Sequence, residues 1–174
     1  MMLLNNQLKV VPFTTHIPLK DVCKHIKQKP LLEAVKLLNQ SLKKNFGIKK
    51  PKIAITGLNP HSGDGGLLGN EENKIILPVI KKSLKSGILI TGPLSADSAF
   101  QDKNLKLFDA FLCMYHDQAL IPVKTIDFDN TINYTLGLSF VRTSPDHGTG
   151  YDIANKAVAS ETSLVTAINY AAKI

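Results

Sequence analysis

The stretch KIAITGLNPHSGDGG, residues 52–66, decides the fold. Its first five residues form a short apolar run that leads directly into a glycine-rich loop, which is the pattern of a buried strand. A helix is predicted from Glu71 to Ser86, with acids in its first turn, lysines late and Gly87 as a stop. A second buried strand is predicted at 88–91. Strand, helix and strand with short connections predict an α/β fold around a parallel or mixed sheet.

The same alternation extends in both directions along the chain. A strand is predicted at 8–14, and a helical stretch that is broken near Pro30 is predicted over about 19–46. Further strands are predicted at 111–115 and 132–135, and the final helices at 152–160 and 161–173.

Length and composition favour one globular domain. The chain has 174 residues, of which 44% are hydrophobic and 20% charged, and these values exclude disordered, collagen-like and repeat classes. No apolar run approaches the roughly 18 residues of a membrane span. The first residues also lack the pattern of a signal peptide. Because Cys23 and Cys113 resemble ordinary reduced thiols, we expect a cytoplasmic protein without a membrane partner.

Positive charge is concentrated in the first third of the chain. Residues 1–52 hold eleven lysines against Asp21 and Glu33, whereas the remainder has ten basic and twelve acidic residues. A basic face could attract nucleic acid or an anionic substrate. The lysines nevertheless alternate with apolar residues at helical spacing, and aromatic side chains for base stacking are few. We therefore expect a solvated helix face and no nucleic-acid partner.

The glycine-rich loop at 57–69 is not a dinucleotide fingerprint. A G-x-G-x-x-G motif starting at Gly63 would need glycine at position 68, where the chain has Leu68. The Lys-Ser/Thr pair of a P-loop is also missing. What the glycines do allow is a close approach of a ligand to the backbone beside His61.

Three histidines follow three predicted strands. His16, His61 and His116 each lie where a strand ends, so they could converge at one rim of the sheet. Three imidazoles with an open coordination position suit a catalytic divalent metal, zinc first of all. Asp97 and Asp117 could serve as outer or additional ligands. The alternative, structural or surface histidines, stays open at this point because no local metal motif is present.

Two basic residues in the remainder of the chain suggest an anion pocket. Lys124 and Arg142 each follow an apolar stretch, and Asn133 lies between them. A guanidinium can bind a phosphate or carboxylate through two parallel hydrogen bonds. Two ordinary surface charges are the equally open alternative.

Five segments, taken in order, carry a resemblance to a known family: TTHIPL (14–19), GLNPHSGDGG (57–66), ITGPLSAD (90–97), MYHDQAL (114–120) and INYTLGLSFVRTSPDHGTGYDIA (132–154). They resemble the 4-hydroxythreonine-4-phosphate dehydrogenase family of pyridoxal phosphate biosynthesis. The resemblance implies an isocitrate/isopropylmalate dehydrogenase-like fold, a three-layer αβα arrangement with a mixed sheet. Only the second half of that family is matched, so the fold is expected to be truncated at the N-terminus.

The resemblance also implies roles for individual residues. His16, His61 and His116 match the family's metal ligands, with zinc expected and magnesium or cobalt as alternatives. The residues that match its substrate-binding set are Lys124, Asn133 and Arg142. Asp97 or Asp117 would transfer protons in catalysis. The turn expected to hold the adenosine end of NAD comprises Asp146, His147, Gly148, Thr149 and Asp152.

The implied reaction is an NAD-dependent and metal-dependent oxidation of 4-phosphooxy-L-threonine with decarboxylation to 3-amino-2-oxopropyl phosphate, a step of pyridoxine 5'-phosphate biosynthesis. The family's homodimers share sites between subunits. Residues 1–142 would form the metal-binding, substrate-binding and dimerisation domain. Residues 143–174 would supply the cofactor turn and helices that pack on the missing domain, leaving here either an exposed apolar face or a rearranged packing. An inactive metal-binding fragment and a related phospho-hydroxyacid dehydrogenase remain the alternatives.

Overall fold

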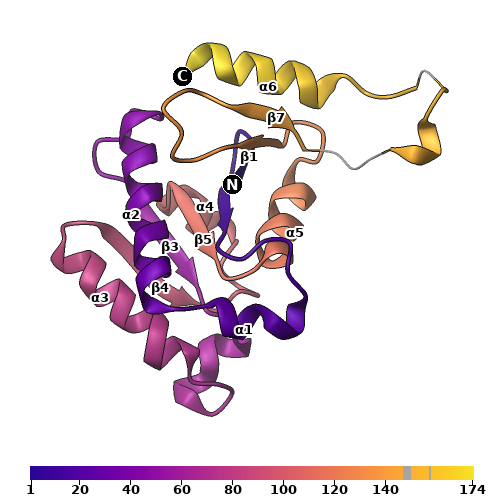
Figure 1. Ribbon diagram of the computed structural model, residues 1–174. Coiled ribbons are helices and arrows are strands. Elements are labelled where there is room, and N and C mark those ends of the chain that lie inside the picture. The colour runs from indigo at the N-terminus through magenta and orange to yellow at the C-terminus, as the bar shows by residue number, and fades with distance from the viewer. Residues whose placement is uncertain (147–149, 157) are drawn as a thin grey trace.

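The computed structural model describes residues 1–146, 150–156 and 158–174, and it contains one mixed sheet between two helical layers (Figure 1). His147, Gly148 and Thr149 of the predicted cofactor turn lie outside the described residues. The sheet has the strand order β4-β3-β5-β2-β1-β6-β7. The strands are β1 (Met2–Leu4), β2 (Lys9–Pro12), β3 (Lys52–Thr56), β4 (Leu89–Leu94), β5 (Ala110–Cys113), β6 (Ile132–Tyr134) and β7 (Thr143–Pro145).

Six α-helices accompany the sheet in the described part of the chain. They are α1 (Val22–His25), α2 (Gln28–Lys44), α3 (Leu77–Lys85), α4 (Asp102–Leu107), α5 (His116–Ile126) and α6 (Thr162–Lys173). Shorter turns of 3-10 helix occur at η1 (Leu19–Asp21), η2 (Pro60–Gly66) and η4 (Tyr151–Ile153), and a π-helical turn, η3 (Glu72–Ile76), leads into α3. None of the helices in the described residues has the length and apolar character to cross a membrane.

Two hydrophobic cores, one on each face of the sheet, hold the helices against it and so define three layers. The larger core contains Leu38 of α2 and Val79 of α3 and lies on one face of the sheet, where Ala167 of α6 joins it. The smaller core joins Phe111 of β5 to Val123 of α5 on the other face. The expected three-layer αβα architecture with a mixed sheet is therefore confirmed.

Strand direction decides where a site can form. Strands β4, β3, β5 and β2 run parallel to one another, whereas β1 pairs antiparallel with β2 and β6, and β6 pairs antiparallel with β7. The carboxyl ends of the four parallel strands therefore share one edge, where open α/β sheets place their ligands. All three predicted strand-end histidines follow strands of this parallel group.

The helical stretch predicted over about 19–46 with a break near Pro30 is confirmed, with the break slightly earlier than expected. It is interrupted at Ile26 and Lys27, ahead of Pro30, and α2 starts at Gln28. Proline within the first turn needs no backbone N–H partner and has a suitable φ, so Pro30 helps to start α2 instead of breaking a longer helix.

The strand predicted at 88–91 was expected to be buried, and only one of its faces is, through Ile88 and Ile90. β4 occupies the edge of the sheet, and Leu89 is 44% exposed. Four elements were not anticipated, namely β1, β7, α4 and α5. α5 has Pro122 in its interior, a residue that normally argues against a helix.

The last segment of the chain joins the sheet. β7 pairs with β6, and α6 packs against both strands, with Thr143 Oγ1 donating a hydrogen bond to the Ala167 carbonyl at 2.9 Å. The helix predicted over 152–160 is wrong, because its described residues contain only the end of η4. Leu164, Val165 and Ile168 on α6 remain about half exposed, as expected for this segment.

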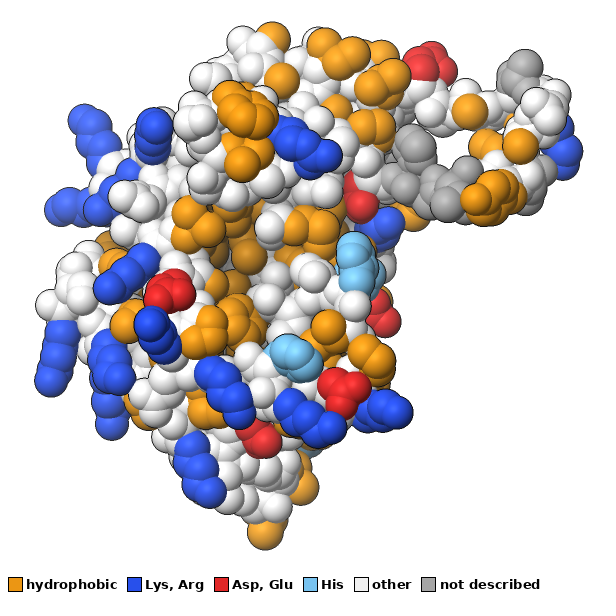
Figure 2. All heavy atoms as spheres, in the orientation of Figure 1, with side chains coloured by type: hydrophobic (Ala, Val, Ile, Leu, Met, Phe, Trp, Pro, Cys, Tyr) orange, Lys and Arg blue, Asp and Glu red, His pale blue; other side chains and the backbone are white. Residues whose placement is uncertain are grey.

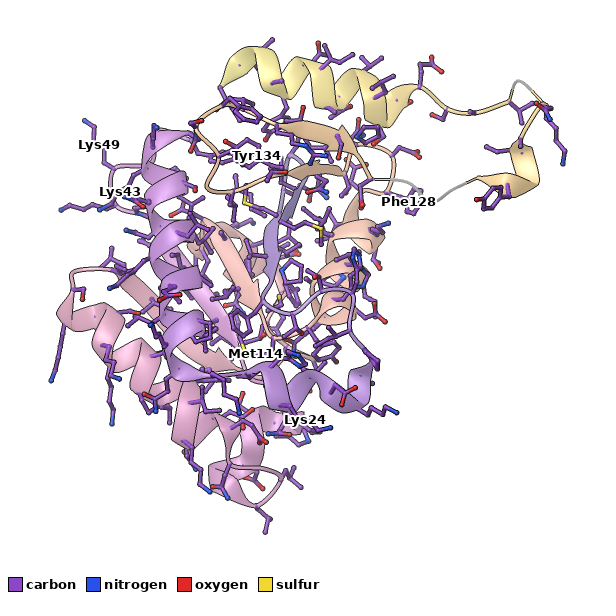
Figure 3. All side chains as sticks on the ribbon, viewed as in Figure 1. Lys24, Lys43, Lys49, Met114, Phe128 and Tyr134 are labelled. Atoms are coloured by element: carbon purple, nitrogen blue, oxygen red, sulfur yellow. The ribbon has the colours of Figure 1, made fainter. Side chains whose placement is uncertain are left out.

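Lysines of the first third cover α2, and further lysines cover α3. Lysine side chains project into solvent over the side of the molecule formed by α2 and α3 in Figure 2, and Figure 3 shows Lys43 and Lys49 pointing away from the core. This arrangement matches the expected solvated helix face.

Candidate functional site

Four predicted site residues lie along the carboxyl edge of the parallel strands. Asp97 follows β4, His61 follows β3, His116 follows β5 and His16 follows β2. Since the strand order is β4-β3-β5-β2, the edge presents them in the order Asp97, His61, His116, His16. Residues that lie far apart in the sequence are thus placed side by side by the sheet.

His16 and His116 form a close pair. Their ring centroids lie 5.6 Å apart, and both rings border a cavity of about 270 Å³ that Thr15 and Tyr115 also line. The two strand extensions are held together by Thr14, whose Oγ1 donates to the Met114 carbonyl at 2.8 Å. The pair therefore rests on backbone that is fixed by the sheet.

His61 and Asp97 share a neighbouring cavity of about 350 Å³. Tyr115 lines both cavities, so the two cavities adjoin at this residue. The side chain of Ser95, and to a smaller extent the charge of His61, lower the pKa of the Asp97 carboxyl below its usual range. Asp97 therefore carries a negative charge at the wall of this cavity.

The loop that carries His61 has an unusual backbone. His61, Ser62 and Asp64 have φ values of 50°, 53° and 43°, and the intervening Gly63 has a φ of 82°. Gly65 continues the series at 65°, so five consecutive residues form a left-handed turn. Left-handed backbone costs an L-residue about 1–2 kcal/mol, and such strain is concentrated at functional sites.

Gln118 joins the backbone behind His61 to the backbone behind His116. Its Oε1 accepts hydrogen bonds from Thr56 Oγ1 and the Met114 N–H, both at 2.7 Å. Its Nε2 donates to the Gly57 carbonyl at 2.8 Å. Figure 3 labels Met114 at the end of β5, where this network sits. Gln118 was not anticipated, because the helix that carries it, α5, was not predicted.

The fit of a metal ion can be judged from the donors present. Zinc–nitrogen bonds of about 2.0–2.1 Å require ligand rings to lie close together, and the His16–His116 separation satisfies this for two ligands. His61 lies one strand away, and among the described residues no three His, Cys, Asp or Glu side chains are grouped tightly enough to hold an ion. The donor types therefore fit a metal, with two of the three imidazoles brought together.

Asp117 is engaged by its neighbour. Its Oδ1 lies 2.6 Å from His116 Nδ1, and its side chain is 71% exposed. This contact orients the imidazole and leaves the opposite ring nitrogen, Nε2, for a ligand. Asp117 thus acts on His116 in this geometry, whereas Asp97 lies across the adjacent cavity.

The three predicted substrate residues lie beyond this edge, around α5, β6 and β7. Asn133 pairs with Ser144 in the β6–β7 ladder, and its neighbours in β6, Ile132 and Tyr134, face the larger core. Asn133 therefore faces the α5 layer. Arg142 is exposed, and its Nη1 donates to Thr135 Oγ1 at 2.9 Å.

Lys124 at the end of α5 contacts a residue assigned to another role. Its Nζ lies 3.2 Å from Asp146 Oδ2 and 5.3 Å from the Phe128 ring centroid. Asp146 was predicted to hold the cofactor, so the structure places it beside a predicted substrate ligand. His147, Gly148 and Thr149 lie outside the described residues, and so does the side chain of Asp152.

Comparison with known proteins gives a consistent result. Residues 1–171 match the family model described as pyridoxal phosphate biosynthetic protein PdxA. A protein of Sulfurihydrogenibium sp. named 4-hydroxythreonine-4-phosphate dehydrogenase is 53% identical over 98% of this chain and 52% of its own length. One of the same name from Aquifex aeolicus is 49% identical over 97% of this chain and 52% of its own. The chain thus spans about half the length of the curated relatives it matches.

Solved structures agree in fold. The 4-hydroxythreonine-4-phosphate dehydrogenase from Klebsiella pneumoniae superposes with a TM-score of 0.87 at 36% identity, covering 99% of this chain and 52% of that one. A terephthalate 1,2-cis-dihydrodioldehydrogenase from Burkholderia xenovorans LB400 superposes with a TM-score of 0.79 at 32% identity, covering 98% and 54%.

Proposed function

Because the chain belongs to the pyridoxal phosphate biosynthetic protein PdxA family, we propose that it forms the metal-binding and substrate-binding half of an NAD-dependent 4-hydroxythreonine-4-phosphate dehydrogenase. The observation that carries the proposal is the row of Asp97, His61, His116 and His16 along one edge of the parallel strands. The reaction oxidises the substrate hydroxyl with loss of CO2 and yields 3-amino-2-oxopropyl phosphate, for cytoplasmic pyridoxine 5'-phosphate synthesis.

The histidines would hold the metal. A divalent ion, zinc first and magnesium or cobalt as alternatives, would supply Lewis acidity at the substrate hydroxyl and carbonyl oxygens. His16 and His116 provide two ligands from one rigid edge, and His61 provides the third from the adjoining loop. A homodimer in which the two subunits share sites is part of the proposal.

The other residues would orient the substrate and move a proton. Asp97 borders the same cavity as His61, so its carboxylate would accept the proton of the substrate hydroxyl there. Arg142 offers an exposed guanidinium to an anionic substrate group. The Lys124 ammonium would exchange its contact with Asp146 for the substrate phosphate, and Asn133 would bind from β6. NAD would then bind near the turn that contains Asp146 and Asp152.

Zinc titration of variants tests the proposal. His61→Ala is expected to abolish stoichiometric zinc binding, because two imidazoles alone hold the ion far more weakly. His25→Ala is the matched control, since His25 is exposed on α1 and, in the described part of the chain, its ring hydrogen-bonds only to the Asp21 carbonyl. One tight zinc per site in His61→Ala would reject the three-histidine assignment.

A second candidate is a dehydrogenase for an unphosphorylated diol or hydroxy acid. The dihydrodiol dehydrogenase from Burkholderia xenovorans favours it, since that protein shares this fold. The two candidate functions are distinguished by measuring the affinity of the zinc-loaded chain for 4-hydroxythreonine and for its 4-phosphate. Tighter binding of the phosphorylated compound supports the first proposal, and equal binding supports the second. Zinc binding without affinity for either compound or for NAD would indicate an inactive metal-binding fragment.

A further inference from the structure

Glu72 is an unexpected residue to find inside the fold. It opens the π-helical turn η3, and only 2% of its surface is exposed. Among the described residues it makes no ion pair with a lysine, arginine or histidine. A buried carboxylate is costly unless hydrogen-bond donors surround it. The hydrogen-bond donors around the Glu72 carboxyl therefore indicate which segment of the chain it holds in place.

All of its hydrogen bonds come from the entrance of the His61 loop. Oε1 accepts the backbone N–H groups of Leu58 at 2.7 Å and of Asn59 at 2.8 Å. Oε2 accepts Asn59 Nδ2 at 2.9 Å. These three hydrogen bonds fix Leu58 and Asn59, just ahead of Pro60 and His61.

The left-handed turn also closes over the same carboxylate. A Cβ atom added at Gly63 would lie 2.7 Å from Glu72 Oε2, so the backbone there rests directly on the carboxylate. A Cβ added at Gly69 would lie 2.3 Å from Asn59 Nδ2. The entrance, the turn and the exit of the loop thus all pack around Glu72 and Asn59.

We propose that Glu72 is a positioning residue that holds the left-handed turn and thereby sets the place of His61 at the edge of the sheet. The inference rests on the proposed function, in which His61 is a metal ligand. Glu72 itself touches neither substrate nor metal. It offsets the strain at His61, Ser62 and Asp64 through bonds that only an acceptor at this position can make.

Two neighbouring substitutions make a matched experiment. Glu72→Gln keeps the shape and one acceptor oxygen, but its amide Nε2 would replace Oε2 and face Asn59 Nδ2, donor against donor. Glu71→Gln removes the same charge one residue away. Glu71 accepts the second Asn59 Nδ2 bond, at 2.8 Å, and among the described residues it accepts no backbone N–H from residues 57–69. Hydrogen exchange of the full chain and zinc affinity are measured for both variants.

In Glu72→Gln we expect amide exchange in residues 57–69 to accelerate at least tenfold while exchange in β5 stays within twofold. Zinc affinity should fall at least tenfold. In Glu71→Gln both quantities should stay within threefold of the parent chain. Equal loop exchange in the two variants would overturn the proposal. The exchange measurement needs no metal, so it decides the role of Glu72 even if zinc does not bind.

A second pair covers the case in which Glu72→Gln fails to fold. Gly63→Ala and Gly65→Ala both introduce a side chain at positive φ, 82° and 65°, but only the first meets Glu72, whereas the second faces open space. Loop exchange should accelerate at least fivefold more in Gly63→Ala than in Gly65→Ala. Indistinguishable loop exchange in these two variants would contradict the contact between the turn and Glu72.

Discussion

Replacing Gln118 by methionine is the sharpest test of how the edge of the sheet is built. Gln118 is 7% exposed, and methionine matches its length without hydrogen-bonding capacity. The change removes three hydrogen bonds, those with Thr56, Met114 and Gly57. These three partners of Gln118 are buried, so bulk water does not readily replace the hydrogen bonds that their polar groups lose.

The size of the effect follows from those three contacts. A net loss of about 1 kcal/mol per hydrogen bond, and up to 3 for a buried group left unpaired, sets the range. The Thr56 hydroxyl can rotate and the neighbouring cavity can admit water, so we expect a loss of about 2–4 kcal/mol in the free energy of unfolding. For a chain of this size each kcal/mol lowers Tm by about 2–4 °C.

Urea denaturation measures the quantity directly, as a shift in midpoint at constant slope. Gln7→Met is the control, because the Gln7 side chain is exposed and the change there should stay within about 0.5 kcal/mol. A loss below about 1 kcal/mol for Gln118→Met would show that the network contributes little. The reasoning that links the two loops through Gln118 would then be refuted.

Two further predictions concern the core and the thiols. Leu38→Ala on α2 leaves a cavity at a fully buried position and should lower the free energy of unfolding by about 2–5 kcal/mol in the same urea titration. Leu84→Ala, at a half-exposed position on α3, should lower it by less than about 1 kcal/mol. Similar losses in the two variants would contradict the described core. Burial raises the pKa of the Cys113 thiol well above its usual range, so a disulfide reagent should titrate only the exposed Cys23 in the native chain and both thiols in urea, and rapid reaction of two native thiols would show that β5 is open to solvent.

The parallel part of the sheet could be predicted because its signals are local. Strand β3 is an apolar run that ends at glycine, and the structure confirms its bounds at Lys52–Thr56. The placement of three histidines at strand ends follows from the same runs. Their common edge needs only the rule that parallel strands share a direction. The antiparallel strands β1 and β7 contain three residues each and carry no such periodic signal.

The geometry within the site could not be predicted, because it depends on long-range contacts. Nothing local in the sequence indicates that Glu72 and Gln118 are buried, since each becomes buried through groups that other segments supply. The separation of His61 from the His16–His116 pair depends on a loop whose backbone adopts a left-handed conformation at residues 61–65. The ion pair between Lys124 and Asp146 likewise joins α5 to a residue beyond β7.

The left-handed turn has a consequence for how the protein can change over evolution. Most residue types are disfavoured at positive φ, and β-branched ones most of all. Substitutions at positions 61–65 are therefore limited by the left-handed backbone conformation, independently of any role in catalysis. Replacing His61 by a bulkier residue is disfavoured at this left-handed position, and the substitution that first introduces a histidine there is disfavoured for the same reason. Lineages that alter substrate choice are therefore expected to do so through the wall residues of the two cavities, while this segment stays nearly fixed in composition.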